Sequence, residues 1–76
     1  MNKDVREEIQ ELIEQLDAIK TRVEELRDDE DNKYSNLPDS LQGSEKGEKM
    51  QEAIDNLDSA SGSIEEAMDF LQEAMN

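Results

Sequence analysis

The sequence predicts an all-α protein built as an antiparallel two-helix hairpin, coiled-coil-like, that can dimerise into a four-helix bundle. Three observations predict this fold. Two stretches repeat apolar residues with a period of seven, a segment rich in turn-forming residues separates them, and no Gly or Pro interrupts the first 31 residues. The 76 residues form one domain, and with no Cys and no His the chain cannot use disulfides or Cys/His zinc sites for stability. Association with another chain is the remaining route.

The first helix is expected over residues 3 to 29. Its apolar residues follow one another at alternating intervals of three and four, which makes a heptad seam. Position a is filled by Ile9, Leu16 and Val23, and position d by Val5, Leu12, Ile19 and Leu26. Ile13 widens this stripe at position e. The acids of residues 28–31 lie at the negative end of the helix dipole, so we expect the helix to fray there.

The connection is expected over residues 30 to 44, which contain the only Pro of the chain. Pro38 disfavours an α conformation at Leu37, and Asn36 with Asp39 three residues later can cap a short helical turn. We place that turn at residues 38–42. Leu37, Leu41 and Tyr34 are expected to fold over the open end of the hairpin.

The second helix is expected over residues 45 to 75. Position a holds Met50, Leu57, Ile64 and Leu71, and alanine recurs at position d as Ala53, Ala60, Ala67 and Ala74. Gly62 costs about 1 kcal/mol in a helix interior, and Ser63 with Glu66 matches a capping box that would start another helix at Ile64. The heptad register passes through this segment without a shift, which favours one continuous helix. Both alternatives stay open on the sequence alone.

The composition argues against catalysis and cofactors. Without His no side chain titrates unperturbed near neutral pH, and without Cys there is no thiolate nucleophile. The acidic run that starts at Asp28 lacks the Gly and the bidentate Glu of a calcium-binding EF-hand in either register, so no metal site is expected. Apolar residues never run more than two in a row, which excludes a membrane span and a signal peptide. We expect a non-enzymatic, cytoplasmic protein without a cofactor.

Charge is the most informative feature of the chain. The formal net charge of -14 disfavours direct binding to nucleic acid or anionic lipid. No Lys or Arg occurs from Met50 to Asn76, where the acids all fall at positions b, c or f: Glu52, Asp55, Asp58, Glu65, Glu66, Asp69 and Glu73. Phe70, at position g beside them, is a candidate interface anchor. This acidic face either keeps a small helical protein soluble or imitates a row of phosphates that meets a basic patch on a partner.

One segment carries a resemblance. Residues 36–55, NLPDSLQGSEKGEKMQEAID, followed by the Ser-Ile-Glu-Glu-Ala motif of residues 63–67, resemble small acidic helical proteins of phages, prophages and Gram-positive bacteria. The resemblance covers residues 34 to 74. Those proteins are largely uncharacterised, so the resemblance implies a mobile-element setting and neither a site nor an activity.

The leading functional hypothesis is an acidic protein-interaction module, of the kind that phages use as inhibitors, which occupies a basic nucleic-acid-binding surface of a host protein. The alternative is a purely structural homo-oligomeric bundle. A homodimer is expected in either case, because one hairpin buries a single layer between its helices and Ile13, Phe70 and Met75 fall beside the seam.

Overall fold

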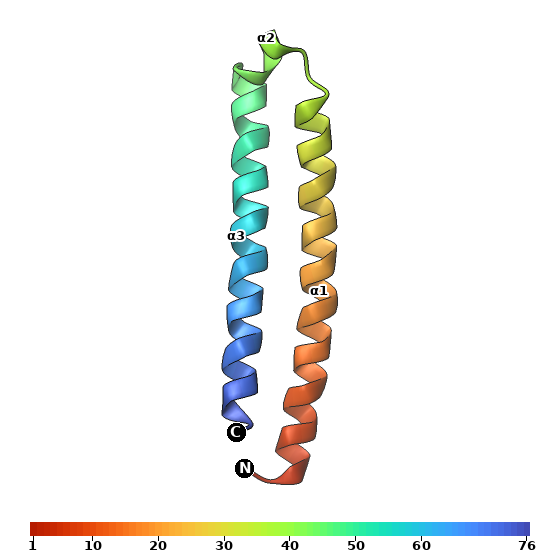
Figure 1. Cartoon of the computed structure of the whole chain (residues 1–76), viewed down its shortest axis with the longest axis vertical. Helices are drawn as coiled ribbons and strands as arrows, with labels where there is room; N and C mark the ends of the chain where they lie inside the picture. Colours follow the sequence, from red (N-terminus) through yellow and green to blue (C-terminus); the bar gives the residue numbers. More distant parts are fainter.

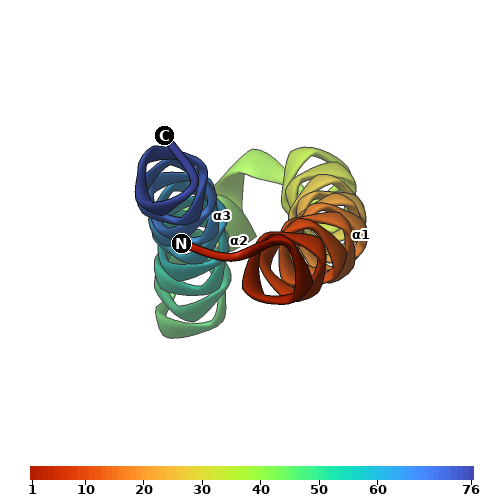
Figure 2. The same ribbon diagram turned by 90° about the horizontal axis from the view of Figure 1, so that it is seen from below.

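The computed structural model describes residues 1–76 and confirms the all-helical hairpin (Figure 1). It consists of α1 (Lys3–Ser35), α2 (Asp39–Gln42) and α3 (Glu45–Ala74). α1 and α3 lie side by side and antiparallel, α2 closes one end, and both termini lie at the other end (Figures 1 and 2). The molecule is a rod whose Cα atoms extend over 58 × 15 × 12 Å.

α1 extends beyond the end that the sequence predicts. Asn2 caps its first turn, where the Asn2 side chain accepts a hydrogen bond of 2.9 Å from the Val5 amide. The predicted end at residue 29 is wrong, because the helix continues to Ser35. The side-chain amide of Gln42 donates to the carbonyl oxygens of Tyr34 and Leu37, both at 3.3 Å, and so satisfies acceptors at the helix end. Lys33 in the last turn offsets the acids there.

The connection between the long helices is short and tightly packed. Ser44 caps α3 by accepting a hydrogen bond from the Gly47 amide. Gly47 is buried, and a Cβ atom at this position would lie 2.1 Å from the Gln42 carbonyl oxygen, so only glycine fits. Tyr34 and Leu37 are half-buried at this end as expected, whereas Leu41 remains exposed.

α3 is continuous through Gly62, so the alternative of a break before Ile64 is wrong. A Cβ atom at Gly62 would meet no other atom within 4 Å. Gly62 therefore faces solvent, and the helix accepts its weak propensity because packing on the other side of α3 holds the segment.

The contact between α1 and α3 uses heptad positions a and e, where the sequence pattern indicates a and d. The half-buried side chains of α1 are Ile9, Ile13, Leu16, Lys20, Val23, Arg27, Glu30 and Tyr34, together with Glu24 at the edge. On α3 the same positions place Met50, Leu57, Ile64, Met68, Leu71 and Met75 half-buried, with Ile54 and Ser61 buried. Met50, Met68 and Met75 therefore pack in the seam.

Side-chain size explains the rotation of α3. From Ala53 onward, position d of α3 holds only alanine, whereas position e includes Ile54, Met68 and Met75, so turning α3 toward e buries more apolar surface. Even so, only 3 of the 76 residues are buried, and Ile54 is the single apolar side chain among them. The hairpin on its own has a thin core.

Candidate protein-interaction surface

All eight residues that the sequence marks as a candidate site lie on the exposed surface of α3. They do not form one uniform face, because the rotation of α3 separates them into two groups. Asp58 and Glu65, at position b, lie along the edge that faces α1. The other acids, at positions c and f, point away from α1.

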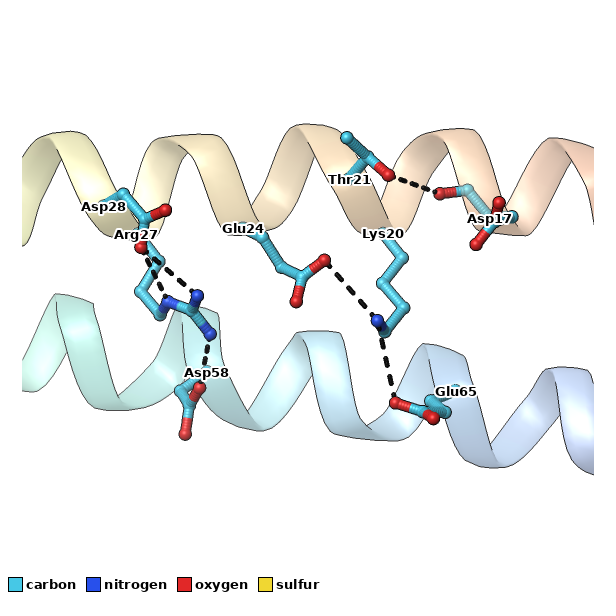
Figure 3. Close-up of polar contacts among 8 residues, drawn as sticks. All are labelled: Asp17, Lys20, Thr21, Glu24, Arg27, Asp28, Asp58 and Glu65. Atoms are coloured by element: carbon cyan, nitrogen blue, oxygen red, sulfur yellow. Dashed lines mark hydrogen bonds and ion pairs between the residues drawn. The ribbon is translucent and has the colours of Figure 1, made fainter.

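Asp58 and Glu65 form ion pairs with α1 (Figure 3). Arg27 Nη1 donates a hydrogen bond of 2.8 Å to Asp58 Oδ1, and Lys20 Nζ lies 3.6 Å from Glu65 Oε2. On their own helix, Arg27 Nη2 lies 3.2 Å from Asp28 Oδ1 and Lys20 Nζ lies 3.4 Å from Glu24 Oε1. Asp58 and Glu65 are thus bound within the hairpin and do not belong to a free acidic surface.

These ion pairs raise the pKa values of both basic side chains. The hydrogen bonds that Arg27 donates to Asp58 and Asp28 hold its pKa above the ordinary value. For Lys20, burial of the amine at the seam lowers the pKa, but attraction by Glu24 and Glu65 outweighs it and the pKa lies above 10.5. Both groups are cationic at neutral pH and close one edge of the helix contact.

The remaining five acids form what we call the outer acidic face: Glu52, Asp55, Glu66, Asp69 and Glu73. They are exposed, and none of the ion pairs in the structure involves them. No basic residue follows Lys49 in the chain. The negative charge of this face is therefore uncompensated and fully available to a partner.

Phe70 lies between the outer acidic face and the alanines at position d. Its side chain is 67% exposed, the largest exposed fraction among the large apolar residues. The hairpin itself does not cover this ring, which leaves it free to anchor a contact.

One group of surface residues was assigned to the wrong place from the sequence. The four apolar residues at position d of α1, which the pattern placed in the seam, are exposed: Val5, Leu12, Ile19 and Leu26. Ala60, Ala67 and Ala74 at position d of α3 are also exposed. The signal that could have revealed this was the contrast on α3 between alanine at d and large residues at e.

The structure has one shallow hollow, of about 490 Å³, lined by Glu30, Glu45, Lys46, Lys49, Met50 and Ala53. Lys49 already pairs with Glu45 at 3.5 Å, so the hollow carries both signs of charge. No group of His, Cys, Asp or Glu side chains is arranged to hold a metal ion.

None of the helices combines the length and apolar composition needed to cross a bilayer. Comparison with protein families, with characterised proteins and with solved structures finds no match for this chain.

Proposed function

We propose that this protein is a non-enzymatic interaction module whose outer acidic face docks on a basic, nucleic-acid-binding surface of another protein. In this role it acts in the cytoplasm as an inhibitor of the phage type, because it occupies the groove that nucleic acid would otherwise fill. Phe70, at the border of the face, anchors the contact.

A single observation carries the proposal, namely the one-sided distribution of charge on α3. If the acids served solubility alone, they could be interspersed with lysines, as on most small helical proteins. Here the outer acidic face has no basic neighbour on its own helix after Lys49, and the two basic residues of α1 that reach α3, Lys20 and Arg27, pair with Glu65 and Asp58 instead. The arrangement concentrates negative potential along one side of a rod.

The spacing of the carboxylates is compatible with a surface that binds phosphates. Acids three residues apart, such as Asp69 and Glu66, are separated by about 4.5 Å along a helix axis, and one DNA strand carries a phosphate about every 3.4 Å. The flexible stems of Lys and Arg accommodate a difference of this size. Such a field speeds encounter with a basic partner, while each exposed pair adds little affinity.

The test compares two variants that lose the same charge from opposite helices. In the first, Glu52, Glu66 and Glu73 become Gln and Asp55 and Asp69 become Asn. In the control, the same change is made on the exposed side of α1, at Glu7, Glu11, Glu14, Glu25 and Asp17. Both variants keep Asp58 and Glu65, so both keep the ion pairs that join the helices.

Each protein is used to capture partners from host lysate at low and at high salt, and bound proteins are then challenged with duplex DNA. We expect the parent and the α1 control to retain a basic partner that duplex DNA releases, and the α3 variant to lose it. Equal capture by all three proteins at both salt concentrations would show that the outer acidic face serves solubility alone.

A second candidate function is that of a purely structural homo-oligomeric bundle. The exposed apolar residues at position d of α1 favour it, because a soluble monomer has no use for them. A protein with this function alone would bind no basic partner, and the capture experiment separates the two.

A further inference from the structure

A continuous apolar face runs along one side of the hairpin. It consists of Val5, Leu12, Ile19 and Leu26 on α1 and of Ala60, Ala67, Ala74 and Phe70 on α3. The exposed fractions on α1 rise from 39% at Val5 to 55% at Leu26, so the hairpin does not cover these side chains. We call this surface the apolar face.

The two helices present these residues on the same side of the molecule. Antiparallel helices are related by a two-fold axis perpendicular to the plane that contains both helices, so equivalent heptad positions share a side of that plane. The ion pairs of Arg27 with Asp58 and of Lys20 with Glu65 join position e of α1 to position b of α3. In each helix, positions b and d lie on opposite flanks of the a/e seam. The ion pairs mark the side of position b, so both rows of position-d residues lie on the opposite side of the molecule.

The register of the ion pairs also sets which residues lie level with each other. Arg27 is level with Asp58, so Leu26 lies across from Ala60, Ile19 from Ala67 and Leu12 from Ala74. Each large side chain of α1 is thus next to a small one of α3. The apolar face has a ridge on one helix and a shallow channel on the other.

The side of the molecule that carries the apolar face has more basic than acidic residues, unlike the rest of the chain. Positions d and g hold the basic residues Arg22, Lys33, Lys46 and Lys49 but only two acids, Glu8 and Asp29. In a chain of net charge -14, this side is therefore net positive. It is the one side on which two copies can approach without strong repulsion between their acids.

The exposed area of the hairpin also favours the association of two copies. A compact monomer of 8.7 kDa exposes roughly 4,700 Å², whereas this hairpin exposes 5572 Å². The difference is close to the area of about 800 Å² that each partner buries in a standard interface. The hairpin therefore exposes more surface than a compact monomer of its mass, by an amount that one standard interface would cover.

We infer that a second copy of this chain covers the apolar face and forms an antiparallel four-helix bundle. In this bundle each α1 lies over α3 of the partner copy, because the ridge of one copy then fits the channel of the other. The outer acidic faces remain outside, so the dimer and the proposed function use different surfaces and each can fail without the other.

The test is sedimentation equilibrium of the full chain at micromolar concentration, with two triple variants. In one, Leu12, Ile19 and Leu26 become Gln. In the matched control, the preceding residues Glu11, Ala18 and Glu25 become Gln, which puts the same side chains at the same levels of α1 but on the outer side. We expect about 17 kDa for the parent and for the control, and a monomer for the first variant.

Because the first variant could unfold, melting of the parent is also followed at several protein concentrations. A dimer melts at a higher temperature when it is more concentrated, and a monomer does not. A parent mass of 8.7 kDa with a melting temperature independent of concentration would overturn the inference. So would a dimer that persists in the Leu12→Gln, Ile19→Gln, Leu26→Gln variant.

Discussion

Lys20 Nζ lies 3.6 Å from Glu65 Oε2 and so joins the middle of α1 to α3. Lys20 is at position e, which lies in the seam of this hairpin, and its stem packs between the helices while its amine reaches the edge. The ion pairs of Lys20 and Arg27 mark the register of the hairpin, and the apolar residues at position d of α1 lie on the far side.

The pKa of Lys20 predicts how its ion pairs depend on pH. Because the pKa is raised in the folded protein, the stabilisation is fully present below the ordinary value of 10.5 and is lost as the pH rises through the folded value. We compare the parent with Lys20→Met by thermal melting. The difference in melting temperature should be constant around neutral pH and should move in favour of the variant above about pH 10.5. A difference that stays constant at strongly alkaline pH would show that Lys20 acts through its stem alone.

Substitution by alanine should have opposite effects on stability at Gly62 and at Gly47. Gly62→Ala should stabilise the protein by roughly 0.5–1 kcal/mol, because a methyl group at this exposed helical position meets nothing and improves helix propensity. Gly47→Ala should destabilise it by roughly 2 kcal/mol, because the methyl group would collide with the backbone of Gln42 and Leu41. Urea unfolding of both variants at one protein concentration measures the two effects. The same sign for both would mean that the helices are not packed as described at one of these positions.

The orientation of the two copies in the bundle can be tested by crosslinking, since the chain has no cysteine of its own. If α1 lies over α3 of the partner copy, a mixture of the single variants Ile19→Cys and Ala67→Cys should form a mixed disulfide under mild oxidation. Ile19→Cys alone should crosslink poorly. Rapid crosslinking of Ile19→Cys alone would instead indicate that the two α1 helices lie against each other.

The heptad periods of the sequence were sufficient to predict the hairpin and the residues at position a of its seam. They could not decide which side of each helix faces the other. Ile13 and Met75, at position e, could equally lie beside an a/d seam or inside an a/e seam, and the choice depends on the combined volume of both helices. The sequence did not predict the end of α1 either, because that end is stabilised by a hydrogen bond that the side chain of Gln42 donates to the Tyr34 carbonyl oxygen from a separate element.

The same rotation changed the candidate site. Asp58 and Glu65 have the same spacing and residue type as the other acids of α3, so only the position of α1 separates them from the outer acidic face. What the sequence could predict was the uncompensated charge itself. The exposed apolar face became visible only when the helices were placed together.

If the apolar face joins two copies as proposed, the density of negative charge along the rod increases, which bears on the proposed inhibition of a DNA-binding protein. A single hairpin carries about one net negative charge per 4 Å of its length, whereas duplex DNA carries one per about 1.7 Å. Two copies side by side halve the spacing to about 2 Å. The proposed dimer would therefore approach the charge density of DNA, which the monomer does not.

The most direct measurement is competition with duplex DNA for a purified, sequence-nonspecific DNA-binding protein, followed by fluorescence anisotropy of the labelled DNA. The parent should displace DNA at low salt and lose this ability as salt rises. The variant that lacks the five charges of the outer acidic face should displace far less than the α1 control of equal net charge. Displacement of equal strength by both variants, or none by the parent at low salt, would contradict the account.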